Sequence, residues 1–190
     1  MDLAEFLRRW DQMPALKHAE LIEGVVHLAS PVSLIHADFD HLFHAWLSRY
    51  EDTADGLGIS GNCTCILNGN SFQPDLALRR VTAPENTKYI ERPPGLIIEI
   101  CYSSRSYDMY TKLAAYKLAG VAEYMTVLIE DKRVDWRILN EGRYDMLEPN
   151  RAGFLESPTF PGLRLDTGAV FPPDIKRMKA ALSPNISMRT

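Results

Sequence analysis

The chain has 190 residues, is 46% hydrophobic and carries a formal net charge of −4 at pH 7. Its length suits one domain with a full core and is short for two. The acidic balance gives no bulk electrostatic support for nucleic-acid binding, although a local basic patch can still face phosphate. No apolar run approaches the roughly 20 residues needed to span a bilayer, and Met1 to Glu5 lacks the basic-then-apolar order of a signal peptide.

Three cysteines at low density argue against a disulfide framework and indicate a reducing compartment. We therefore expect a cytoplasmic protein. Cys63 and Cys65 would share one face of a strand. They are either two small apolar side chains or a zinc or redox pair, although their spacing is not that of the usual zinc knuckle.

The N-terminal segment predicts a helix followed by strands. Apolar residues at helical spacing indicate a short amphipathic helix over residues 3–10. Residues 19–28 predict two short strands or one bent strand, with the bend at Gly24. Glu20 lies within this element as a candidate functional acid.

A long helix is predicted next. Ser33 is suited to cap it, and its apolar stripe runs to about Tyr50. His36, Asp40 and His44 lie four residues apart on one face. This row is compatible with metal ligation, but such a row is more often a solvated or hydrogen-bonded face.

Two strands follow the long helix. Residues 59–67 predict one strand, and Asn68-Gly69-Asn70 is a strong hairpin signal. The strand over residues 72–78, which carries Asp75, should therefore pair antiparallel with the one before it. An exposed loop of about a dozen residues comes next, and its Lys88 and Arg92 are suited to contact a polyanion.

Residues 95–101 predict an apolar strand in which Glu99 is the only charge. A carboxylate inside a strand is costly unless something pairs with it, and a metal ion is one such partner. Ser106 is suited to cap a helix that runs through Leu118 and ends at Gly120. Residues 121–129 then predict a buried strand parallel to the Glu99 strand, reached by a right-handed crossover.

The remaining chain predicts a hairpin of residues 133–139 and 143–147, because apolar and polar residues alternate there around a Glu-Gly turn. Residues 160–165 should form a short extended piece along the sheet. We expect one domain over residues 1–171, followed by a partly disordered tail, residues 172–190, that holds one or two helical turns.

The acids on the two central strands suit a magnesium site. Mg²⁺ binds oxygen ligands and keeps several waters, so Asp75 and Glu99 suffice with a substrate phosphate. Lys112 lies about two turns into the following helix, and its long stem can return the ammonium to the strand. Tyr116 shares that helix face. The alternative is that Lys112 pairs only with Asp108 on the surface, at four-residue spacing.

Short motifs occur along the chain in a fixed order. They are Glu20-Leu21-Ile22-Glu23-Gly24, Ser30-Pro31 with His36, Pro74-Asp75, Ile98-Glu99-Ile100, Ser103 to Ser106, Asp108, Lys112, Tyr116 and Gly120 to Tyr124. In order and spacing, this set resembles the Uma-type restriction endonuclease family of the PD-(D/E)XK nuclease superfamily. The resemblance covers Glu20 to Phe171, and Phe160-Pro161-Gly162-Leu163 is similar to the family's closing segment.

The resemblance implies an α/β fold (α+β mixed sheet) with a restriction-endonuclease-like core, in which helices flank a central mixed β-sheet. It implies a nuclease that hydrolyses DNA phosphodiester bonds with Mg²⁺ or Mn²⁺. Asp75 and Glu99 would hold the metal, Glu20 would be a further acid, and Lys112 would be the catalytic lysine, moved from the strand to the helix. The implied supporting residues are His36, Tyr116, Asp108 and Ser103.

Three positions bear on that resemblance. Cys101 occupies the usual lysine position two residues after Glu99, which agrees with a displaced lysine. Tyr102 to Arg105 replaces the family's Ser-Pro-Ser, and Met125 replaces its tryptophan. Neither replacement removes a proposed ligand, so they bear on substrate positioning more than on metal binding.

Two other classes of function are open. A non-catalytic nucleic-acid- or protein-binding module could use the same fold, although such a module has no need of a carboxylate in an apolar strand. A serine hydrolase could use Ser103 or Ser104 with a histidine, but the chain has no Gly-x-Ser-x-Gly elbow. A nuclease that cuts both DNA strands usually needs two sites, which a homodimer would supply.

Overall fold

The computed structural model describes residues 1–28, 31–81, 88–102 and 107–182, with only the backbone at 107–109. Its helices are α1 (Leu3–Asp11), α2 (Leu34–Glu51), α3 (Leu113–Ala119), which continues a π-helical turn η1 (Tyr107–Lys112), α4 (Ile175–Ala181) and a 3-10 turn (Thr167–Ala169). Its strands are β1 (Ala19–Ile22), β2 (Val25–Leu28), β3 (Leu57–Gly61), β4 (Cys65–Leu67), β5 (Asn70–Phe72), β6 (Leu76–Arg80), β7 (Leu96–Cys101), β8 (Glu123–Leu128), β9 (Arg133–Asn140), β10 (Arg143–Met146), β11 (Phe154–Glu156) and β12 (Arg164–Asp166).

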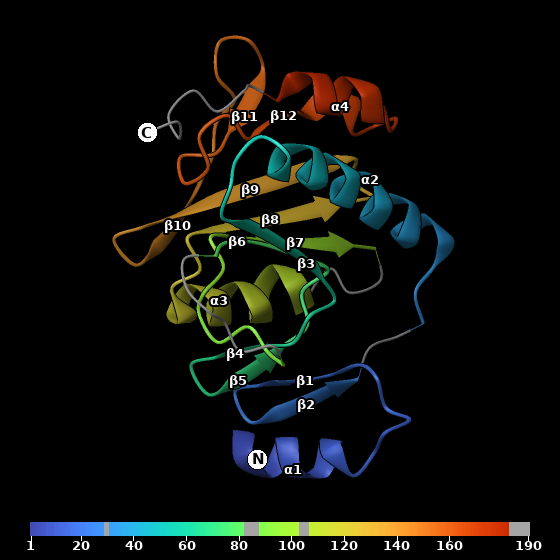
Figure 1. Cartoon of the computed structure of the whole chain (residues 1–190), viewed down its shortest axis with the longest axis vertical. Helices are drawn as coiled ribbons and strands as arrows, with labels where there is room; N and C mark the ends of the chain where they lie inside the picture. Colours follow the sequence, from blue (N-terminus) through green and yellow to red (C-terminus); the bar gives the residue numbers. More distant parts are fainter. Residues whose placement is uncertain (29–30, 82–87, 103–106, 183–190) are drawn as a thin grey trace.

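These elements form stacked layers (Figure 1). From one end of the molecule to the other come α4, α2, a six-stranded sheet, α3, a four-stranded sheet and α1. Within the described ranges, no helix is long and apolar enough to cross a membrane.

The central sheet has the strand order β10-β9-β8-β7-β6-β3. β7 and β8 pair in parallel, and the remaining neighbours pair antiparallel, so the sheet is mixed. Every residue of β7 and of β8 is buried, as the apolar runs in the sequence indicated. The predicted parallel pair is therefore confirmed. The connecting helix is present as η1 and α3, with Gly120 at its C-terminal end as predicted, and the predicted cap Ser106 lies outside the described residues.

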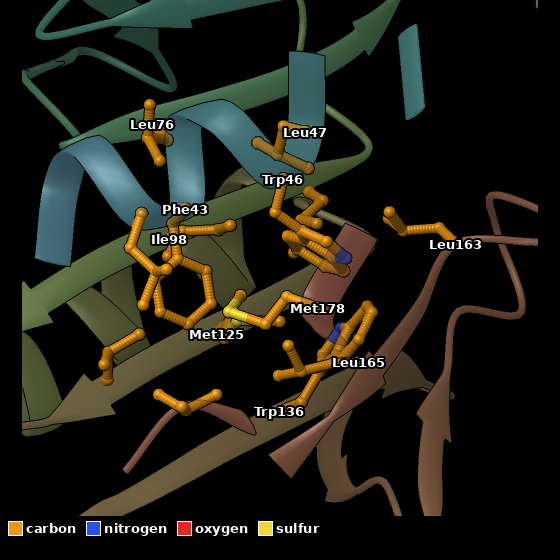
Figure 2. Packing of buried hydrophobic residues seen from close by; sticks show 14 of the residues in the cluster. Phe43, Trp46, Leu47, Leu76, Ile98, Met125, Trp136, Leu163, Leu165 and Met178 are labelled. Atoms are coloured by element: carbon orange, nitrogen blue, oxygen red, sulfur yellow. The ribbon is translucent and has the colours of Figure 1, made fainter. Parts of the chain in front are cut away.

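Helix α2 covers one face of this sheet. The Ser33 hydroxyl accepts a hydrogen bond from the backbone N–H of His36 and caps the helix, as predicted. Its apolar stripe packs on the even-numbered side chains of β6 and β7, including Leu76 and Ile98 (Figure 2), and on odd-numbered side chains of β8. Trp46 and Trp136 meet edge to face with 6.2 Å between ring centroids. The odd-numbered side chains of β7, including Glu99, therefore face the opposite side, where α3 packs.

The strand predicted over residues 59–67 is wrong in one respect, because the chain breaks there into β3 and β4. Asn62 lies between them in the left-handed region, with φ 50°, and the two strands belong to different sheets. β5 pairs with β4 and β6 pairs with β3, both antiparallel. The four strands thus form one long hairpin, with β3 and β4 in its first arm and β5 and β6 in its second, that is shared between the two sheets. Asp75 lies just before β6, where the second arm passes from the four-stranded sheet to the six-stranded sheet.

The C-terminal segment packs onto the far side of α2. Residues 160–165 do not join the central sheet, since β12 pairs with β11 in a separate two-stranded sheet. The predicted helical turns correspond to α4. Met178 of α4 is fully buried in the core formed by α2 and the central sheet (Figure 2). Residues 183–190 of the predicted tail lie outside the described residues.

Met178→Ala tests whether α4 belongs to the domain core. We expect a loss of about 2–5 kcal/mol in the free energy of unfolding, because the substitution leaves a cavity. Lys176→Ala is the matched control: this exposed residue lies on the same helix, and its loss should change stability by about 0.5 kcal/mol or less. Urea unfolding measures both. Equal stabilities for the two variants would mean that the folded core ends near residue 171.

Candidate active site

Asp75 and Glu99 face each other across two neighbouring strands. Leu76 pairs with Ile98 in the antiparallel β6–β7 register, so Asp75, one residue earlier, stands opposite Glu99. The backbone N–H of Ile100 donates to Asp75 Oδ2 at 2.6 Å. The fold therefore fixes one carboxylate by the backbone of the strand that carries the other.

Lys112 joins the two sheets at this point. Its Nζ lies 3.0 Å from Glu99 Oε1 and 3.2 Å from Glu20 Oε1. Glu20 comes from β1 of the four-stranded sheet, and Glu20 Oε1 also accepts from the backbone N–H of Gln73 at 2.7 Å. Lys112 is 4% exposed and Glu99 is 2% exposed. Lys112 is thus a buried ion-pair residue, and a role confined to a surface pair with Asp108 does not fit this burial.

Tyr116 lies one turn beyond Lys112 and donates its hydroxyl to Glu99 Oε1 at 2.9 Å. Its ring is fully buried, 4.6 Å from the Phe72 ring and 5.3 Å from the Tyr124 ring between centroids. Burial, and then the nearby charge of Glu99, raise the pKa of Tyr116 well above its ordinary value. The phenol therefore stays protonated and remains a hydrogen-bond donor to the carboxylate.

His36 is the sixth predicted site residue in this cluster. It lies in the first turn of α2, and its Nε2 is 3.2 Å from Asp75 Oδ1. The structure therefore brings together six of the eight residues singled out in the sequence: Glu20, His36, Asp75, Glu99, Lys112 and Tyr116. The other two are not placed: Ser103 lies outside the described residues, and the side chain of Asp108 is not described.

Asp40 is an acid near this group that the sequence did not indicate as a site residue. It lies one turn after His36 on α2, and its Oδ1 is buried without a hydrogen-bond partner among the described residues. Burial raises the pKa of Asp40, and the negative charge of Asp75 raises it further, while the three histidines of α2 lower it. The four-residue spacing from His36 was visible in the sequence, but the burial was not.

The donor set suits a hard divalent cation. Three carboxylates and one ammonium leave two negative charges around the group, and carboxylate oxygens are the ligands that Mg²⁺ and Mn²⁺ accept. Asp75 and Glu99 are adjacent and can be completed by water. In the part of the chain that is described, no three His, Cys, Asp or Glu side chains form a ready-made metal cluster. Neither the His36, Asp40 and His44 row nor the Cys63 and Cys65 pair therefore belongs to such a cluster.

Cys65 behaves as a core residue. It is fully buried in β4, and burial raises the pKa of its thiol above the ordinary range. Cys63, Cys65 and Cys101 are all free thiols. The apolar interpretation of the Cys63 and Cys65 pair therefore fits the structure better than a reactive thiolate.

The mixed sheet with flanking helices, with Glu99 on a central strand and Asp75 just before the neighbouring strand, defines a restriction-endonuclease-like fold. A crystal structure described as a putative nuclease of DUF820, from Anabaena variabilis, superposes with a TM-score of 0.71 over 96% of this chain and 99% of that chain, at 17% identity. A family model described as "Uma2: Putative restriction endonuclease" matches residues 3–168. No curated protein matches the chain. The chain belongs to the Uma2 family, and the sequence-based recognition of family and fold is confirmed.

Asp40→Asn tests the cost of burying this acid. Because the pKa of Asp40 is raised in the folded state, the native protein loses stability as the pH rises from the unfolded-state pKa through the folded-state pKa. We expect Asp40→Asn to melt above wild type at neutral pH, with the difference vanishing below the ordinary pKa of aspartate. Thermal melts across the acid-to-neutral range measure this.

Asp38→Asn provides the matched control, because Asp38 is an exposed acid on the same helix. Its substitution should give a small difference from wild type that changes little with pH. A pH-independent effect of Asp40→Asn, or one that grows toward acid pH, would contradict the assignment.

Proposed function

We propose that this protein is a metal-dependent endonuclease that hydrolyses phosphodiester bonds of DNA. The observation that carries the proposal is the convergence of three acids and one lysine from four separate elements. These residues are distant in sequence, yet they meet at the junction of two sheets. Lys112 pairs with both Glu20 and Glu99, and Asp75 accepts a hydrogen bond from the backbone N–H of Ile100, the residue after Glu99. Membership of a family described as restriction endonucleases supports the same conclusion.

Asp75 and Glu99 would hold Mg²⁺ or Mn²⁺. When bound, such an ion polarises a phosphate oxygen and lowers the pKa of a coordinated water. The chain prepares both acids for this role. The Ile100 N–H and His36 orient Asp75, while Tyr116 and Lys112 orient Glu99. Ligands fixed in this way lose little conformational entropy when they bind an ion.

Lys112 would act on the phosphate and the attacking water. Its ammonium sits among carboxylates, in a buried setting where electrostatic interactions are stronger than in water. A positive charge placed there stabilises the negative charge that gathers on the phosphate in the transition state. The ion pairs with Glu20 and Glu99 direct the Lys112 Nζ toward the acids.

The DNA backbone is negatively charged and the chain as a whole is acidic. Binding DNA next to the site acids therefore needs local positive side chains. Lys88 and Arg92 flank Ile90, whose backbone pairs with β4 in the sheet next to the site. Both are exposed. We propose that they contact the DNA backbone.

A non-catalytic binding module is the alternative. Burying Glu99 and Lys112 next to two further, partly buried acids is costly, and a protein that only binds has no reason to keep such a group. Burial of the site therefore favours catalysis.

Divalent cations should stabilise the folded protein, because three acids and one lysine meet in the described part of the site and a cation would reduce the repulsion between the acids. A ligand that binds only the native state adds about 2.7 kcal/mol at 100 times its Kd. We expect the melting temperature to rise with Mg²⁺ or Mn²⁺ and the rise to be largely lost in Glu99→Gln. Asp145→Asn removes a carboxylate of β10 that pairs with Arg143, and should keep the rise. An equal rise in all three proteins would place metal binding elsewhere.

Cleavage of supercoiled DNA tests the reaction. We expect activity with Mg²⁺ or Mn²⁺ and none in chelator. Lys112→Met and Asp75→Ala should each lower the rate by about 100-fold or more, the scale of losing one charge-stabilising group. Lys117→Met, on the same helix and without a contact to the site acids among the described interactions, should cleave like wild type.

The outcomes separate the two functions. Cleavage that persists in chelator or in Asp75→Ala would contradict the metal mechanism. A folded, metal-binding protein that cleaves no DNA or RNA would favour the binding module.

A further inference from the structure

Strand β2 is an exposed, uncharged sheet edge. Among the described residues it pairs only with β1, and it ends the strand order β2-β1-β5-β4. Val25, Val26 and Leu28 are 56%, 38% and 64% exposed. Three further exposed apolar side chains, Val32, Leu34 and Ile35, follow in the chain. Residues 24–35 contain no Asp, Glu, Lys or Arg, whereas 24% of the whole chain is charged. Exposed apolar side chains along an unpaired sheet edge are typical of a surface that pairs with another strand.

The other edges of the two large sheets are protected. β10 carries Arg143 and Asp145, and charges on an edge strand oppose pairing. β4 exchanges backbone hydrogen bonds with Ile90. β3 is flanked by α2, and its Leu57 and Ile59 pack against the core. Against this background β2 has none of the usual devices that prevent edge-to-edge pairing, such as a charge, a proline or a bulge.

The layers that cover β1 stop short of β2 on both faces. On one face α1 buries Ala19 and Leu21, yet their cross-strand partners Leu28 and Val26 stay exposed. On the other face Ile22 is buried, while its partner Val25 is exposed. A further strand paired with β2, with side chains packed on its two faces, would cover the exposed side chains of β2 on both faces.

We propose that a second copy of this chain pairs with β2, strand to strand and antiparallel, so that two four-stranded sheets become one of eight strands. A two-fold axis perpendicular to the sheet relates antiparallel edge strands, so one apolar edge meets its own copy and is self-complementary. The absence of cationic side chains disfavours a phosphate backbone as the partner, because nucleic-acid surfaces need Lys or Arg.

This symmetry has a consequence for the site. A rotation about an axis perpendicular to the sheet keeps each face on its own side. Glu20 alternates with Leu21 along β1, so its side chain points away from the face that α1 covers. The two Glu20 side chains of a dimer, and with them both candidate sites, therefore lie on the same face. This part rests on the proposed nuclease function, in which two sites on one face can address the two strands of one duplex.

The test measures solution mass by light scattering and sedimentation, without metal or nucleic acid. Wild type should have twice the 21.5 kDa mass of one chain. Leu28→Lys should be a folded monomer with a melting curve of similar shape. Leu118→Lys is the matched control, because Leu118 is 66% exposed on α3, close to the 64% of Leu28. It should remain a dimer. Val25→Lys repeats the test at a second position should Leu28→Lys fail to fold.

Hydrogen exchange distinguishes strand pairing from other contacts. The β2 amides that do not bond to β1 should be protected in wild type and in Leu118→Lys, and should exchange rapidly in the monomeric variant. A monomeric wild type, a dimer that survives both β2 substitutions, or equal exchange of these amides in monomer and dimer would each overturn the proposal. So would a monomer whose DNA affinity depends on Leu28. Because none of these readouts needs cleavage, loss of the nuclease proposal would leave the result unaffected.

Discussion

The Glu99 carboxylate inside a buried strand is the constraint on which the site depends. All six residues of β7 are buried, and a charge in such a strand is stable only when it is paired. Lys112 and Tyr116 supply the pairing from η1 and α3. Lys112 then contacts Glu20 in the other sheet. One buried charge thereby ties β7, the crossover helix and β1 together.

The position of Asp75 follows from a second constraint, the break in the long hairpin. In the first arm, between β3 and β4, Asn62 adopts the left-handed conformation. In the second arm, between β5 and β6, Pro74 precedes Asp75 and has no backbone N–H to donate to a sheet. The arms then enter separate sheets. Asp75 sits where the chain crosses between them, close enough for the Ile100 N–H to fix its carboxylate. The site is therefore built at the junction of the two sheets, and neither sheet contains it alone.

The sequence predicted the central elements well because their patterns are strong. A lone acid in an apolar run identified Glu99, and helical spacing placed Lys112 and Tyr116 on one face. The break at Asn62 was missed because alternation along residues 59–67 does not reveal a change of sheet. Asp40 was missed because spacing on a helix gives the face but not its burial. The packing of Met178 depends on α2, which is distant in sequence and set by tertiary structure.

The candidate site and the β2 edge differ sharply in charge. The acids are concentrated where a divalent cation would balance them, so in the proposed function the bare site repels phosphate and the cation must bind before or together with the substrate. The β2 edge has no formal charge except through His27. Electrostatic repulsion between two acidic copies would therefore be small at this edge, where apolar contact and backbone pairing can act. In the two proposals, the local arrangement of charge, rather than the net value of −4, would separate the surface for a polyanion from the surface for a second copy.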